Sequence, residues 1–428
     1  MTLAGRKCDI MWHDRGFKWC IALVAMTLAA QFGCNVNIPA LDSLIDGLDL
    51  DFDSQDPSGE DEPDWTDTFP DDDFPGDDFP DDDFPDDGFL DDDFFPDDDF
   101  SDDGAQDGGS ESTTGAQVLF DELWRTFDEN YSYFEYKGID WDDVRTRYRP
   151  RFASDLSDDE FVDGLIEMLG ELSDFHVEIM HPDGTWYGTD TQEVELNYTS
   201  TPRNRYTLDD NGYQTLGDGV IHHARFQESI AYIRVDTFGT GAFDNISDED
   251  IENLFAAYAD ADGIIFDVRP NNGGNEDIAM KFASHFTADE VIYGYTETRD
   301  GPAHDDFGPL NEKSLVPTQQ NRFDGPVACL IGQRCLSSAE WFTLMMRACP
   351  NVTLVGDTTR GGSGFPREFE LANGVRYTVP RWIAYTDDFE GIEDFGIEPD
   401  SWIPADESFD ESHDYVVEFA LTLLLPGE

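Results

Sequence analysis

A repeat of aspartate, proline and phenylalanine sets the first limit on how this chain of 428 residues can fold. Phenylalanine recurs every five residues, between Pro-Asp-Asp-Asp segments or close variants, at Phe69, Phe74, Phe79, Phe84, Phe89 and Phe94. A period of five fits neither a helix nor a strand, so no apolar face forms. The aspartates repel one another and cannot offset a backbone ordering cost of about 1–2 kcal/mol per residue. The sequence therefore predicts a disordered acidic linker over residues 34–115.

The charge balance excludes two classes of partner. The chain carries 95 Asp+Glu against 25 Lys+Arg, for a formal net charge of −70. Such a field repels nucleic acid and anionic lipid, so we expect neither as a partner. Beyond the N-terminus, lysine occurs at Lys137, Lys281 and Lys313 alone. A second interpretation of the linker is a tail that binds Ca²⁺ or a partner weakly, because carboxylates without an ordered loop hold hard cations loosely.

The N-terminus has the pattern of an export signal. Arg15 and Lys18 precede an apolar run over 19–30. That run of about 12 residues is shorter than the roughly 20 that cross a bilayer, and it fits the apolar region of a signal peptide. We predict a signal peptide over residues 1–33 and an exported protein: periplasmic, cell-surface or secreted. Two alternatives stay open: a lipoprotein anchored to the membrane through Cys34, or ordinary secretion.

The cysteines give no metal signature. Three of them, Cys329, Cys335 and Cys349, lie in the body of the chain, an odd number that allows one disulfide and one free thiol. No Cys-x-x-Cys occurs, and no His/Cys cluster has the spacing of a zinc site. We therefore expect neither a metal nor another cofactor.

Apolar periodicity divides the ordered part of the chain in two. From Ala116, residues such as Phe120, Leu123 and Phe127 recur at helical spacing, and Ser157 with Glu160 forms a capping-box pattern. A helical bundle over residues 116–180 follows. Short β-branched runs then alternate with helical runs, which predicts an α/β domain over residues 181–428 with buried, largely parallel strands. The strands are expected at 230–235, 263–268, 327–331 and 352–355, and the helices at 277–286 and 339–347.

Two strand ends carry residues suited to chemistry. The run Asp267–Gly274 (DVRPNNGG) puts two glycines before a helix, where exposed N–H groups would bind an anion. The run Cys335–Glu340 (CLSSAE) puts serines between a strand and the N-terminus of a helix. The alternatives are a plain turn for the first run and a helix-capping serine for the second.

A catalytic serine needs a base, and His176 in LSDFHV is the candidate. A lone histidine is more often an ordinary polar residue. The chain also offers other histidines, at His181, His222, His223, His285, His304 and His413.

Five segments occur in a suggestive order: LSDFHV, DVRPNNGG, CLSSAE, VGD with Thr359 and Gly361, and Ile392–Asp400 (IEDFGIEPD). In this order they resemble the tricorn-type and carboxyl-terminal-processing serine peptidases, over residues 116–402. The resemblance implies a crotonase-like α/β fold for residues 181–428. It also implies a serine endopeptidase that acts on a peptide or protein substrate, which the N-terminal signal pattern predicts to be exported, and it leaves the oligomeric state open.

The resemblance assigns roles to individual residues. The nucleophile falls on Ser337, with the N–H of Ser338 and that of Gly273 or Gly274 as the oxyanion hole. The processing branch uses a lysine base, but the matching position here is Gly362, so a Ser-Lys dyad is excluded. The tricorn-like branch uses histidine and glutamate, which fall on His176 as general base and Glu393 as its orienting partner.

The chain departs from the family pattern at two points. Tricorn-like sites place a serine before the histidine, where this chain has Phe175. The stretch between His176 and the strand at 230 is also too short for a peptide-binding PDZ domain. Two alternatives stay open: an inactive ligand-binding protein on the same fold, which Phe175 and Gly362 favour, or an esterase that uses the same triad.

Overall fold

The computed structural model describes residues 115–190, 193–199, 204–207, 212–227, 229–410 and 412–425. The predicted signal peptide, Cys34 and the phenylalanine repeat lie outside these residues. Within the described ranges, no helix is both long enough and apolar enough to cross a membrane.

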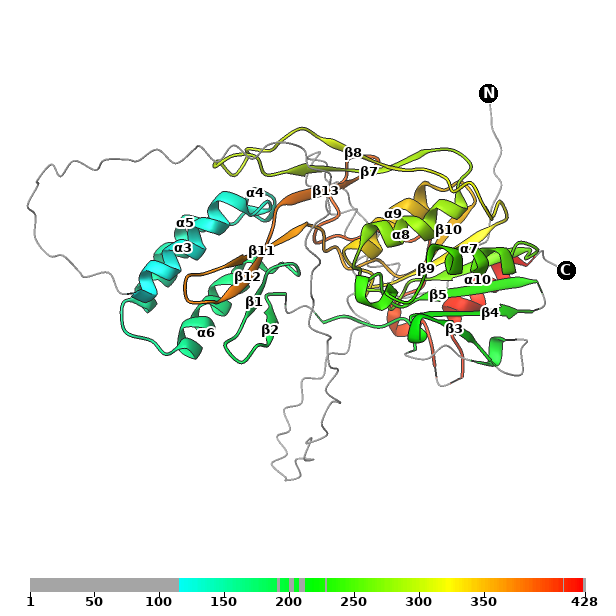
Figure 1. The fold of residues 1–428 in the computed structure, drawn as a ribbon, viewed down its shortest axis with the longest axis horizontal. Coiled ribbons are helices and arrows are strands. Elements are labelled where there is room, and N and C mark those ends of the chain that lie inside the picture. Colours follow the sequence, from blue (N-terminus) through cyan, green and yellow to red (C-terminus); the bar gives the residue numbers. More distant parts are fainter. Residues whose placement is uncertain are drawn as a thin grey trace, which may run out of the picture. The chain divides into compact units, whose positions relative to one another are not determined.

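A seven-stranded sheet forms the centre of the α/β part (Figure 1). Its strands, in spatial order, are β14 (Ser401–Trp402), β10 (Val352–Gly356), β9 (Val327–Ile331), β6 (Gly263–Asp267), β5 (Ile230–Val235), β4 (Ile221–Phe226) and β3 (Gln214–Leu216). The five strands from β14 to β5 run parallel, and β4 and β3 continue the sheet antiparallel. The predicted parallel, buried strands are confirmed, with β5 and β9 at the expected bounds.

Helices cover both faces of this sheet. The helices α7 (Asp248–Ala257), α8 (Glu276–Ala283) and α9 (Ser338–Ala348) share one core with Ile264 and Phe266 of β6. The helix α10 (Tyr415–Leu424) packs with Ile265 of β6 in a separate core on the other face. Side chains alternate across a strand, so β6 contributes to both cores. This arrangement brings the C-terminal ends of β6 and β9, and the loops that follow them, to the same edge of the sheet.

Two smaller sheets and further helices complete the described part. One sheet has the order β11 (Pro366–Glu370), β12 (Arg376–Pro380), β1 (Glu178–Met180), β2 (Trp186–Gly188), and the other has β13 (Trp382–Thr386), β7 (Val291–Thr298), β8 (Asn311–Leu315). The N-terminal helices are α3 (Gly115–Asn130), α4 (Phe134–Lys137), α5 (Trp141–Tyr148) and α6 (Asp158–Leu169). Short 3₁₀ helices lie at Arg149–Phe152, Gly170–Leu172, Asn204–Tyr206, Gly217–Gly219, Thr240–Phe243, Ser284–Phe286 and Ala405–Glu407.

The N-terminal helices pack against a sheet. Phe127 of α3 stacks on Tyr377 of β12, with ring centroids 5.9 Å apart, and both belong to one core with Ile179 of β1. The helices and the four-stranded sheet thus share one core, and the expected domain boundary at residue 180 does not separate two cores. The capping box of Ser157 and Glu160 begins α6 as predicted.

The three cysteines of the body are free. Cys329, Cys335 and Cys349 are all buried and free, so no disulfide forms among the cysteines that the structure describes. Burial raises the pKa of the Cys349 thiol to about 12, which keeps it protonated and unreactive.

Candidate active site

Ser337 occupies a strained turn between β9 and α9. Its backbone has φ 54° and ψ −123°, in a region that side-chain-bearing residues rarely adopt. Such strain concentrates at functional sites, and a sharp strand-to-helix turn of this kind exposes a nucleophilic serine. The Ser337 side chain makes no capping hydrogen bond to the helix, so the helix-cap alternative is wrong. The Ser338 hydroxyl is already engaged, because it donates to the carbonyl of Gly274 over 2.6 Å.

The glycine turn after β6 packs directly against Ser337. Gly273 has φ 104°, and a Cβ on it would lie 2.9 Å from the Cβ of Ser337 and 3.0 Å from the nitrogen of Ser338. The Gly273 N–H donates to the side chain of Asn271 over 2.9 Å. Within the described ranges, the N–H groups of Gly274 and Ser338 have no acceptor. Of the expected oxyanion donors, Gly273 is therefore occupied, while Gly274 and Ser338 are available.

The loop before β1 holds His176. Its N–H donates to Asp174 Oδ1 over 2.8 Å, and its carbonyl accepts from Thr378 Oγ1 of β12 over 2.8 Å. The side chain is almost enclosed, and its Nδ1 has no hydrogen-bond partner within the described part of the chain. Burial lowers the pKa of the imidazole to about 4, so the ring is neutral at pH 7. A neutral imidazole can accept a proton.

Gly362 connects the histidine loop with the serine turn. Its carbonyl accepts from the N–H of Ser337 over 3.1 Å. A Cβ on Gly362 would lie 3.5 Å from the Cβ of Phe175 and 2.2 Å from Cδ1 of Leu336. The segment that follows β10 thus bonds the turn of Ser337 and passes close to the residue before His176. A side chain at position 362 would have to displace the end of the Leu336 side chain. No hydrogen bond joins His176 to Ser337 in the part of the chain that the structure describes.

Glu340 fixes this glycine segment. It is fully buried one turn after Ser337, and it accepts from Thr359 Oγ1 (2.6 Å), Gly361 N (2.8 Å) and Gly362 N (2.9 Å). Burial raises the pKa of its carboxyl to about 7. The sequence placed Glu340 at the end of the run CLSSAE, but it did not reveal this role because the three donors lie about 20 residues further along the chain.

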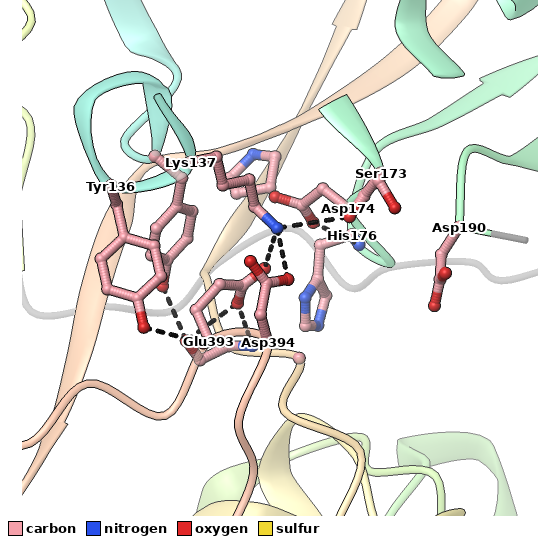
Figure 2. Close-up of polar contacts among 12 residues, drawn as sticks. Tyr136, Lys137, Ser173, Asp174, His176, Asp190, Glu393 and Asp394 are labelled. Atoms are coloured by element: carbon pink, nitrogen blue, oxygen red, sulfur yellow. Dashed lines mark hydrogen bonds and ion pairs between the residues drawn. The ribbon is translucent and has the colours of Figure 1, made fainter. Parts of the chain in front are cut away.

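Glu393 lies apart from the role expected of it. Its carboxylate accepts from Ser363, over 2.8 Å from the N–H and 3.2 Å from the hydroxyl, and pairs with Lys137 Nζ at 3.2 Å. Burial raises its pKa well above the ordinary value. Figure 2 draws no contact between Glu393 and His176, and none is found among the described residues. The expected direct contact is therefore not made.

Sequence reasoning missed several neighbours of Glu393. Lys137 comes from α4, and the hydroxyl of Tyr133 lies 2.6 Å from that of Ser363. In the sequence, only the scarcity of lysine could have drawn attention to Lys137 as a candidate functional residue. The order of the motifs did not indicate that Ser363 would contact Glu393. The family pattern has its serine at another position, the one that Phe175 occupies in this chain.

These parts together suit acyl transfer. A half-buried serine stands at a helix N-terminus, two unoccupied N–H groups flank it, and a neutral imidazole lies on the adjoining loop. Acyl transfer needs a nucleophile, a base and donors for the developing oxyanion.

Comparisons with known proteins agree with this geometry. The family model of peptidase family S41 matches residues 229–403, and that of the tricorn protease C1 domain matches residues 114–170. A curated relative, tricorn protease homolog 1 of Streptomyces coelicolor, is 21% identical over 369 residues, covering 67% of this chain and 33% of its own. The chain therefore spans about a third of that relative's length.

Solved structures show the same fold. A protein of Parabacteroides merdae, named as a candidate peptidase, is 30% identical, covers 73% of this chain and 98% of its own, and has a TM-score of 0.65. Mature CPAF is 12% identical, covers 72% and 96%, and has a TM-score of 0.53. On these matches, the chain belongs to peptidase family S41, a family of serine-type peptidases.

Proposed function

We propose that this protein is an exported endopeptidase that hydrolyses peptide bonds of peptide or protein substrates through an acyl-enzyme on Ser337. The observation that carries the proposal is the strained backbone of Ser337 at the start of α9, packed against the glycine turn. A helix cap needs no such strain, whereas an exposed nucleophile does.

The mechanism follows from the groups around Ser337. His176 takes the proton from the Ser337 hydroxyl, and Oγ attacks the substrate carbonyl. The N–H groups of Gly274 and Ser338 donate to the oxyanion, and one such donor contributes roughly 3–4 kcal/mol. The imidazolium then gives its proton to the leaving amine, and water hydrolyses the acyl-enzyme with His176 again as base.

Substrate binding is needed in this mechanism to bring the base close to the nucleophile. His176 and Ser337 are not hydrogen-bonded in the structure, and catalytic hydrogen bonds often tighten when the substrate binds. We propose that the substrate brings the loop of His176 against Ser337. Support for the approach comes from Gly362, whose carbonyl accepts from the Ser337 N–H and on which a Cβ would lie 3.5 Å from the Cβ of Phe175.

Finer features of the architecture are part of the same proposal. We assign the seven-stranded sheet with its helices to a crotonase-like core, and the N-terminal helices to the bundle that family resemblance implies. Residues 1–33 would be removed on export, leaving residues 34–115 as a linker. Mass spectrometry of the mature N-terminus tests this: an acylated Cys34 would establish the lipid anchor, an unmodified N-terminus nearby would establish secretion, and an intact Met1 would contradict export.

A second function, an inactive ligand-binding protein, is favoured by one observation. Among the residues that the structure describes, the Nδ1 atom of His176 has no hydrogen-bond partner, and burial lowers the pKa of the ring to about 4, which makes it a weak base. The two functions differ in whether Ser337 reacts.

The test compares wild type with Ser337→Ala on a mixed peptide library. The proposal predicts cleavage by the wild type and none by the variant, with the same thermal unfolding curve for both. Equal cleavage by the two proteins would contradict the assignment of Ser337. A wild type that cleaves nothing and never reacts with a fluorophosphonate would favour the binding protein.

A further inference from the structure

Lys137 lies at the centre of a cluster of charges near His176, in which Asp174 and Glu393 are buried and Asp394 is exposed (Figure 2). Its side chain is 7% exposed, and its Nζ lies 2.6 Å from Asp394 Oδ1 and 3.2 Å from Glu393 Oε1. The same nitrogen donates to the carbonyl of Ser173 over 3.2 Å. Enclosing a flexible lysine costs solvation and side-chain entropy, so these three contacts must compensate for both.

The three contacts join two loops that are distant in sequence. Ser173 begins the loop that carries His176, and Asp174 in that loop accepts the His176 N–H. Glu393 and Asp394 belong to the segment after β13. Lys137 itself ends α4, in the N-terminal helical part. One side chain from the helical part therefore connects the loop of the proposed base with the loop of the proposed carboxylate.

Other groups from the same part of the chain reinforce this connection. The Tyr131 hydroxyl donates to Asp174 Oδ2 over 2.8 Å, and the Tyr136 hydroxyl donates to the carbonyl of Glu393 over 2.8 Å. The acids that face Lys137 are Asp174, Glu393 and Asp394, and its attraction lowers the pKa values of the first two, which burial raises. Three carboxyl groups thus surround one ammonium group.

We propose that Lys137 is a positioning residue of this active site, which holds the loop of His176 at a fixed place relative to the Glu393 carboxylate. The inference rests on the proposed function of Ser337 and His176, and it gives the N-terminal helical part a role in catalysis. A purely structural ion pair would stabilise the fold equally but would leave the rate of the chemical step unchanged.

The experiment measures covalent labelling of Ser337 by a fluorophosphonate probe, on the full chain, across a range of pH. Three variants separate charge from shape: Lys137→Met, Lys137→Gln and Lys137→Arg. Lys281→Met is the matched control, because Lys281 is half-exposed and pairs with Asp248 on the surface. Thermal unfolding shows which variants are folded, and Lys137→Gln with Lys137→Arg carries the test if Lys137→Met does not fold.

We expect Lys137→Gln to lower the maximal labelling rate about 10- to 100-fold, with little change in the probe concentration at half-maximal rate, because small displacements of a base cost rates of this size. Lys137→Arg should recover most of the rate, and Lys281→Met should match the wild type. Without the lysine the carboxyl pKa values rise, so the acid limb of the labelling profile should move to higher pH.

A folded Lys137→Gln protein with the rate and pH profile of the wild type would overturn the inference while leaving the proposed function intact. Failure of the proposed function looks different, because then Ser337→Ala labels as fast as the wild type, or the wild type never labels.

Discussion

Two buried charge clusters in this protein differ in how well their charges balance. In the first, on the sheet, Arg269 bonds two carboxylates: Asp267 (2.9 and 2.7 Å) and Asp414 (3.0 and 2.9 Å). Tyr232 donates to Asp267 as well, over 2.7 Å. Although burial opposes it, Arg269 holds the pKa of Asp267 below its ordinary value. Every carboxylate oxygen in this cluster accepts a hydrogen bond, so we assign the cluster a structural role.

In the second cluster, three carboxyl groups face a single cation, Lys137. Burial raises the pKa of Asp174 to about 6 and that of Glu393 well above its ordinary value, despite the nearby lysine. Buried groups with strongly perturbed pKa values are common at functional sites. We therefore expect the cluster around Arg269 to contribute to the stability of the fold and the cluster around Lys137 to contribute to the rate of the reaction.

The largest effect should come from the proposed base. His176→Ala should lower fluorophosphonate labelling of Ser337 by roughly 10²–10⁴-fold, because a positioned base contributes that much to a rate. Lys281→Ala should retain the wild-type rate. A Lys281→Ala protein that is inactive but folded would mean that the base is wrongly assigned.

One substitution in each cluster separates the effect on stability from the effect on the reaction rate. Arg269→Met leaves two buried carboxylates without their cation, so it should lower the free energy of unfolding by about 3–5 kcal/mol in urea titrations. Glu393→Gln should change that free energy by less than about 1 kcal/mol, since a carboxyl with a raised pKa gains little from its charge. Its labelling rate, measured on folded protein, should fall further than that of Arg269→Met. The reverse pattern would reject the comparison.

The pH dependence of stability should have opposite signs for the two clusters. The pKa of Asp174 is raised in the folded state, so the folded protein keeps a proton that the unfolded chain loses, and stability falls as pH rises from about 4 to 7. Asp174→Asn removes this fall and should gain about 3 kcal/mol relative to wild type over that range. The pKa of Asp267 is lowered, so its contribution is present above about pH 4 and is lost below it. Urea unfolding of the variant at several pH values measures the difference, and parallel curves would contradict the prediction.

The smallest effect should follow from restoring the serine that precedes the histidine in the family pattern. Phe175→Ser should change the labelling rate less than about threefold, because the Phe175 side chain is 40% exposed and Ser363 already donates to Glu393. Ser363→Ala should have the larger effect of the two. A large gain from Phe175→Ser would show that Ser363 does not replace the missing hydroxyl.

Much of the α/β part could be predicted from sequence because its signals are local. β5 and β9 are continuous apolar runs, and in the N-terminal helical part Ser157 with Glu160 likewise marks the start of α6 within four residues. The turn of Ser337 was also recognisable, since a strand, two serines and a helix follow one another directly.

The surroundings of the candidate site could not be predicted in the same way. The contacts of Glu393 with Lys137 and Ser363 join residues from three separate parts of the chain, and no local pattern encodes them. Family resemblance assigned Glu393 to the site, but it did not indicate which groups occupy its oxygens. The use of the Gly273 N–H by Asn271 depends likewise on the exact geometry of the turn.

The most direct test of the account is the position of a fluorophosphonate adduct, mapped by mass spectrometry on the full-length protein. The account predicts one modified peptide, with the added mass on Ser337, and its loss in both Ser337→Ala and His176→Ala. An adduct on another serine such as Ser338 or Ser363, or labelling that survives in His176→Ala at the wild-type rate, would contradict it.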